Sequence, residues 1–159
     1  MKKMIFFVLV FQMLVAFGQA ETNKKGLVWE AVYKRVDTLE LKLYFYYPEK
    51  MEDKAYPAII FFFGGGWIGG SIGQFKPQAE YFAKRGMVCV LADYRVQKRH
   101  GVAPFESLKD AKSAIRFLRA NAGKYHVDPE RIAASGGSAG GHLAAATATI
   151  EKYNDGRDD

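Results

Sequence analysis

The sequence has a single cysteine, Cys89, among its 159 residues. One thiol cannot form an internal disulfide, so the chain is not a small disulfide-stabilised domain. Because Cys89 lies in the apolar run Met87 to Leu91, we expect a buried core residue rather than a reactive thiol. The sequence also lacks a Gly-Lys-Ser/Thr element, and its basic residues are interspersed with acidic ones. We therefore expect no P-loop and no nucleic-acid partner.

The sequence has no apolar run long enough to span a membrane comfortably. Its N-terminal run, Met4 to Phe17, follows Lys2 and Lys3, is interrupted by Gln12, and is followed by small residues. This pattern predicts a secretory signal peptide over residues 1–20, and hence a secreted or periplasmic protein with no stable membrane association after cleavage. An uncleaved anchor is the alternative. Without that segment the chain has 21 basic and 17 acidic residues, and this mild basic excess is typical of a solvated surface.

The remaining residues, 21–159, predict one domain in which strands and helices alternate. Polarity that alternates with period two, and short apolar runs, predict strands over residues 28–36, 39–47, 57–63, 87–92 and 131–135. Apolar residues at helical spacing predict helices over residues 75–84, 106–120 and 139–150. The order is a β-hairpin followed by βαβαβα, which predicts the α/β class with a mostly parallel sheet. The strand at 131–135 is expected at an exposed edge of that sheet.

Ser138 lies in the motif Gly136-x-Ser138-x-Gly140, between the last predicted strand and the last predicted helix. A nucleophilic serine on a sharp strand-to-helix turn needs neighbours without side chains, because a Cβ there would collide with the strand or the helix. The motif therefore predicts an exposed serine nucleophile. The acid and the histidine that activate such a serine follow it in the chain, and the only later histidine is His142, which we interpret as structural.

Two other segments precede this motif: the glycine-rich segment Phe63 to Trp67, and Asp93-Tyr94-Arg95 after the next predicted strand. With all three segments in this order, residues 27–150 closely resemble the α/β-hydrolase family. The resemblance is to the esterase and lipase branch related to hormone-sensitive lipase and bacterial acetyl esterases. The sequence departs from that family at Phe63, where a histidine usually opens the glycine-rich loop, which leaves open how this loop is oriented.

The resemblance implies that Ser138 is the nucleophile and that the backbone amides of Gly65, Gly66 and Ala139 form an oxyanion hole. It implies a serine hydrolase that needs no metal or cofactor and acts on small-molecule or carbohydrate carboxylic esters. The reaction expected is that of an acetyl esterase, with polysaccharide deacylation as one candidate. Because the triad acid and histidine are missing, we expect the chain to be truncated after the helix that follows Ser138. It would then be the N-terminal portion of the hydrolase domain, inactive alone.

Two other functions remain open at this point: a non-catalytic hydrolase-fold binding protein, and a peptidase of the prolyl-oligopeptidase branch. A third interpretation comes from Gly64-x-Gly66-x-x-Gly69, which matches a dinucleotide-binding pattern. Against it, later residues delay the helix that should begin at the third glycine.

The other candidate residues have structural interpretations. His100 and His126 are expected to be solvated, and Asp110 to be a surface or helix-positioning charge. Asp93 and Arg95 follow a strand, where active-site loops gather, but an internal ion pair that holds the loop is at least as good an explanation. Trp67 and Tyr94 are aromatic residues at strand ends, for which we expect packing rather than catalysis.

Overall fold

The computed structural model describes residues 28–156, and the predicted signal peptide lies outside them. Five strands form one sheet: β1 (Val28–Val36), β2 (Leu39–Tyr46), β3 (Tyr56–Phe62), β4 (Val88–Ala92) and β5 (Val127–Gly136). The α-helices are α1 (Lys76–Ala83), α2 (Gln97–His100), α3 (Pro104–Ala120) and α4 (Ala139–Thr149). Two short 3-10 helices, η1 (Ile72–Phe75) and η2 (Ala122–Tyr125), precede α1 and β5.

The sheet has the strand order β1-β2-β4-β3-β5. The strands β4, β3 and β5 run parallel, whereas β1 pairs antiparallel with β2 and β2 pairs antiparallel with β4. The predicted hairpin and α/β class are confirmed. Among the described residues β5 pairs with β3 alone, so it forms an edge of the sheet, as predicted.

Two local features differ from the predicted elements. Residues 97–100, for which no helix or strand was predicted, form the short helix α2. The last strand was predicted from residue 131, but β5 begins at Val127 and includes Asp128 and Pro129. The pairing of β5 with β3 shifts register between Tyr56 and Ala58. This irregularity accommodates Pro129 in β5, because proline has no N–H to donate to the neighbouring strand.

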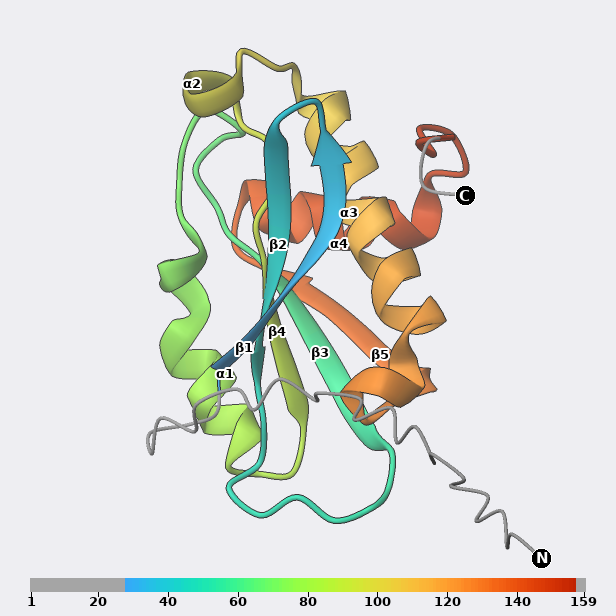
Figure 1. Cartoon of the computed structure of the whole chain (residues 1–159). Coiled ribbons are helices and arrows are strands. Elements are labelled where there is room, and N and C mark those ends of the chain that lie inside the picture. Colours follow the sequence, from blue (N-terminus) through green and yellow to red (C-terminus); the bar gives the residue numbers. More distant parts are fainter. Residues whose placement is uncertain (1–27, 157–159) are drawn as a thin grey trace, which may run out of the picture.

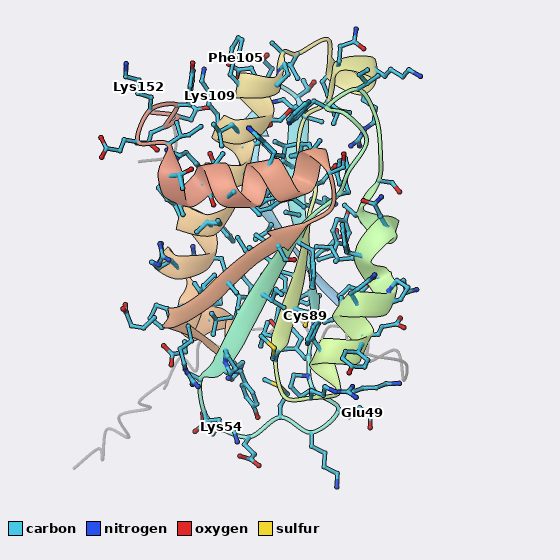
Figure 2. All side chains as sticks on the ribbon, turned by 180° about the vertical axis from the view of Figure 1, so that it is seen from behind. Glu49, Lys54, Cys89, Phe105, Lys109 and Lys152 are labelled. Carbon is cyan, nitrogen blue, oxygen red and sulfur yellow. The ribbon has the colours of Figure 1, made fainter. Side chains whose placement is uncertain are left out.

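Helices cover both faces of the sheet (Figure 1). One face packs against α1 through Phe61, Cys89 and Leu91, and the opposite face packs against α3 and α4. Cys89 is fully buried, as expected, between the sheet and α1 (Figure 2). Burial raises the pKa of Cys89 to about 12, so the thiol stays protonated and unreactive at neutral pH.

The carboxyl ends of β3, β4 and β5 meet at one end of the sheet because these strands are parallel. The glycine-rich segment, the segment that contains α2, and the turn before α4 therefore lie at that end (Figure 1). Ligand sites of open α/β sheets form at the carboxyl ends of the strands. Within residues 28–156, no helix is both long and apolar enough to cross a membrane.

Candidate active site

Ser138 occupies the tight turn between β5 and α4 and is exposed. Its backbone has φ 52° and ψ −119°, a combination that residues with a side chain rarely adopt. Strained backbone of this kind costs on the order of 1–3 kcal/mol and persists where the surrounding packing imposes it, often at active sites. The turn lifts the serine side chain out of the sheet at the first turn of α4, whose N-terminal dipole favours negative charge.

The two flanking glycines are required by packing. A Cβ on Gly136 would lie 2.5 Å from the carbonyl oxygen of Phe62, and one on Gly140 would lie 2.0 Å from the same oxygen. Real Cβ atoms essentially never approach heavy atoms closer than 3.0 Å. The end of β3 thus packs directly against both sides of the serine turn. The predicted steric reason for the glycines is confirmed.

The glycine-rich loop, residues 63–70, packs against this turn. A Cβ on Gly64 would lie 2.6 Å from the carbonyl oxygen of Gly137, the residue before Ser138. The amide of Gly64 donates a hydrogen bond to Oε1 of Gln74 at 2.5 Å. The carbonyl of Gly65 accepts hydrogen bonds from the amides of Ile68 (3.0 Å) and Gly69 (3.1 Å), which closes the loop into a compact turn.

Three backbone amides next to this turn remain available as donors. In the described part of the chain, the N–H groups of Gly65, Gly66 and Ala139 donate to no protein acceptor, whereas the N–H of Gly64 is engaged by Gln74. Gly65 and Gly66 have φ values of 138° and 63°, conformations that favour glycine. Unused amides beside an exposed serine are the components of an anion-binding site.

The loop is oriented at its start by an aromatic pair instead of a histidine. The ring of Phe63 is buried and stacks on Tyr94, with centroids 4.0 Å apart and 14° between the planes. The hydroxyl of Tyr94 donates a hydrogen bond to the Phe63 carbonyl at 2.5 Å. Burial raises the pKa of Tyr94 above its ordinary value, so the phenol remains a donor. The packing role expected for Tyr94 is confirmed.

The segment after β4 holds the other side of the loop. The amides of Gln97 and Lys98 donate to the carbonyls of Trp67 (2.8 Å) and Ile68 (2.9 Å). The ring of Trp67 is half-buried, and its Nε1 is buried without a hydrogen-bond partner among the described residues. The exposed ring of His142 meets the Trp67 ring edge to face, with centroids 5.3 Å apart.

Arg95 anchors this segment to α3 through buried ion pairs. Its Nε donates to Oδ2 of Asp110 at 2.7 Å, and its second guanidinium nitrogen donates to Asp110 Oδ1 and Glu106 Oε2, both at 2.8 Å. Asp93 pairs instead with Arg99 at 2.9 Å. Both predicted ion-pairing residues are therefore paired, but not with each other.

Of the two interpretations of Asp110, a surface charge is wrong, because its side chain is fully buried, whereas its ion pair with Arg95 agrees with a charge that positions α3. Besides Arg95 it contacts the ammonium of Lys34 at 3.0 Å, and Lys34 also pairs with Asp155 at 2.7 Å. A register irregularity between Val32 and Lys34 in β1 explains the misplacement, since Tyr33 and Lys34 are both buried there. Strict alternation of buried and exposed side chains along β1 does not predict that two successive residues are buried.

The remaining histidines lie away from Ser138 in the sequence. His126 is exposed after η2, as expected. His100 is half-buried, and its Nδ1 accepts a hydrogen bond from the Val96 amide at 2.9 Å, so the expected solvated imidazole was wrong. No group of three histidine, cysteine, aspartate or glutamate side chains in residues 28–156 is arranged to hold a metal ion.

The dinucleotide-binding interpretation fails in the structure. No helix begins at Gly69, whose amide instead donates to Gly65 within the loop. The next α-helix, α1, begins only at Lys76, after η1. A helix N-terminus at the third glycine, which would hold the pyrophosphate, is therefore missing.

A surface hollow lies at the opposite end of the sheet from Ser138. It is lined by residues before β3 and after α1, among them Glu49, Lys54, Tyr56 and Lys84. Figure 2 shows Glu49 and Lys54 at that end, far from the turn that opens α4. The hollow is separate from the candidate active site.

A mixed sheet with the exposed serine on a strained turn between β5 and α4 defines an α/β-hydrolase. The BD-FAE family model matches residues 43–157, and the chain belongs to this family of α/β-hydrolase esterases.

Curated relatives include two proteins of Mycobacterium tuberculosis. Esterase LipC is 41% identical over 96 residues, which are 60% of this chain and 23% of LipC. Carboxylesterase NlhH is 32% identical over 109 residues, which are 67% of this chain and 33% of NlhH. The chain thus spans about a quarter to a third of the length of these relatives.

Solved structures of esterase 2 from Thermogutta terrifontis are also similar. Its apo form has a TM-score of 0.81 and 50% identity, over 87% of this chain and 52% of that chain. The same esterase phosphonylated by cyclosarin has a TM-score of 0.80 and 51% identity, over 84% of this chain and 50% of that chain.

Proposed function

We propose that the complete protein hydrolyses carboxylic esters with Ser138 as the nucleophile. The observation that carries this proposal is the backbone of Ser138, held at φ 52° and ψ −119° between two glycines that admit no Cβ. The packing maintains a strained, exposed serine, which is the geometry of an activated nucleophile on this fold. The family and the esterase relatives support the same reaction.

In the proposed reaction, Oγ of Ser138 attacks the acyl carbon and the carbonyl oxygen becomes an alkoxide. The amides of Gly65, Gly66 and Ala139 would stabilise that charge, and the loss of one such donor typically costs about 100- to 1,000-fold in kcat. The alcohol then leaves, and water releases the acid from the acyl-enzyme. The Ser138 side chain makes no N-cap hydrogen bond to α4, and we assign the base that accepts its proton to none of the described residues.

We further propose a short-chain acyl group as the substrate's acid part. The similar esterase from T. terrifontis has been solved with propionate bound and with butyrate bound, which supports acids of this size. Acetylated carbohydrate is the natural ester that we favour, because the predicted signal peptide over residues 1–20 would place the enzyme outside the cytoplasm. Hydrolysis rates for acetyl, butyryl and decanoyl p-nitrophenyl esters and acetyl release from acetylated xylan test these proposals.

The test of the nucleophile is Ser138→Ala in the full-length protein. We expect hydrolysis of p-nitrophenyl acetate to fall at least about 1,000-fold and labelling by a fluorophosphonate probe to disappear. Ser135→Ala, a change of the same size three residues earlier in β5, is the matched control and should retain both activities. Full turnover by Ser138→Ala would remove this serine from the mechanism. Cleavage of p-nitroanilides in preference to esters would instead support a peptidase, and an unlabelled, inactive wild type would support a binding protein.

A further inference from the structure

His100 makes an unusual contact with the start of its own short helix. Its Nδ1 accepts a hydrogen bond from the amide of Val96, which is the N-cap of α2, at 2.9 Å. The amide of His100 also donates to the Val96 carbonyl at 2.9 Å. A ring nitrogen that accepts a hydrogen bond carries no proton, so the imidazole is neutral and its proton is on Nε2. Val96 itself is fully buried.

The two residues directly after Val96 hold the glycine-rich loop. The amides of Gln97 and Lys98 donate to the carbonyls of Trp67 and Ile68. Trp67 directly follows Gly66, whose amide belongs to the proposed oxyanion hole. A short chain of contacts therefore leads from the His100 imidazole through Val96 and Gln97 to the loop beside Ser138.

We propose that His100 is a positioning residue: its neutral imidazole fixes Val96 so that the next two amides hold the glycine-rich loop in place against the serine turn. Among the described residues, the ring has no hydrogen bond to Ser138 or to the loop, and in this proposal it acts through the backbone of residues 96–98. The catalytic part of this inference rests on the proposed function, whereas its structural part does not.

The contact gives the loop a dependence on pH. Burial and the neighbouring Arg99 lower the pKa of His100 from its ordinary value of 6.5; Asp93 after β4, the hydrogen bond with the Val96 backbone and Asp110 on α3 act in the opposite direction, and the net shift is downward. The ring is therefore neutral at neutral pH. When the pH falls through the lowered pKa, Nδ1 gains a proton and can no longer accept from Val96. The unfolded chain takes up this proton at a higher pH, so the contribution to stability is present above about pH 6.5 and is lost below it.

Two substitutions separate the hydrogen bond from the ring. His100→Asn places an oxygen where Nδ1 lies and keeps an acceptor that does not titrate, whereas His100→Leu places a methyl group there. In the full-length protein at neutral pH, we expect His100→Leu to accelerate amide hydrogen exchange at the hydrogen-bonded amides of residues 68, 69 and 96–98 by about tenfold. His100→Asn should exchange at close to the wild-type rate, also below pH 6. Equal protection of these residues in all three proteins would overturn the proposal.

Kinetics supply the second measurement. We expect His100→Leu to lower kcat for p-nitrophenyl acetate by about tenfold with KM unchanged, because a misplaced loop weakens contacts made in the transition state. His100→Asn should restore kcat and remove one ionisation from the acid limb of its pH profile. A wild-type kcat in His100→Leu, or an unchanged acid limb in His100→Asn, would contradict the catalytic role. If the wild-type protein has no Ser138-dependent activity, the proposed function fails and hydrogen exchange alone decides whether His100 holds the loop.

Discussion

The chain has two glycine-rich turns at the same end of the sheet, and close packing holds one of them more completely than the other. At the serine turn, a Cβ on Gly136 or Gly140 would meet backbone atoms at 2.6 Å or less. In the glycine-rich loop, a Cβ on Gly66 or Gly69 would meet nothing within 4 Å, although one on Gly64, Gly65 or Gly70 would meet backbone at 2.6 Å or less. Close packing against the end of β3 fixes the first turn, whereas the second is closely packed only in part and is also held by hydrogen bonds from distant residues.

Because of this difference, substitutions in the two turns are expected to affect different quantities, the stability of the fold in one case and the activity in the other. A larger residue in the serine turn has to displace backbone of β3, so its cost falls on the folded state as a whole. The loop instead depends on Gln74 and on the amides of residues 97 and 98. Loss of one of these contacts leaves the fold intact and changes where the amides of Gly65 and Gly66 point. Such changes are expected to lower kcat while the protein stays folded.

The largest effect on stability is expected for Gly140→Ala. The new Cβ would lie 2.0 Å from the Phe62 carbonyl oxygen and 2.5 Å from that of Phe63, and neither backbone group can move without disturbing the sheet. We expect a loss of about 3 kcal/mol or more in the free energy of unfolding, measured by urea denaturation of the full-length protein. Gly141→Ala is the control, since its Cβ would lie 3.1 Å from Gly136 and small shifts accommodate it. Equal stability of the two variants would show that packing does not fix the serine turn.

A smaller effect on stability, but a clear one on activity, is expected for Gln74→Leu. The variant removes the acceptor of the Gly64 amide, which should cost about 1–2 kcal/mol in the free energy of unfolding. Because Gly64 directly precedes the proposed oxyanion amides, kcat for p-nitrophenyl acetate should fall about tenfold. Gln74→Glu keeps a side-chain oxygen at the same position and should retain most of both quantities. A kcat in Gln74→Leu equal to that of the wild type would mean that the loop keeps its position without this bond.

The serine turn and the loop also differ in how far the sequence predicts them. The motif around Ser138 predicts the turn, its exposure and the reason for Gly136 and Gly140, because all of these follow from local geometry. The order of strands and helices likewise follows from periodicity in short segments. The loop was predicted by resemblance, but the residues that hold it were not. Neither Gln74 nor His100 carries a local signal of a hydrogen bond to the backbone of another residue.

The buried charges show more clearly that local sequence patterns do not predict long-range contacts. Lys34 on β1 and Arg95 after β4 meet at Asp110 on α3, so three segments far apart in the sequence form one buried network. Asp110 lies between two lysines, Lys109 and Lys112, and that local composition favours a solvated surface. The register irregularity in β1 and the packing of α3 decide otherwise, and both depend on tertiary contacts. A charge on a predicted amphipathic helix can therefore be assigned to the surface only when its long-range partners are known.

The smallest effect is expected for Gly69→Ala, which adds a Cβ at a loop position with open space around it. Gly69 does not have a positive φ, and a Cβ there would point into open space. An alanine therefore keeps the hydrogen bond from its amide to the Gly65 carbonyl and displaces nothing. We expect a change below about 0.5 kcal/mol in the free energy of unfolding and below about twofold in kcat. In a dinucleotide-binding loop the third glycine lets the helix pack closely on the strand, and alanine there is the smallest change that adds volume. A large loss of stability in Gly69→Ala would mean that close packing, and not hydrogen bonding alone, holds this part of the loop.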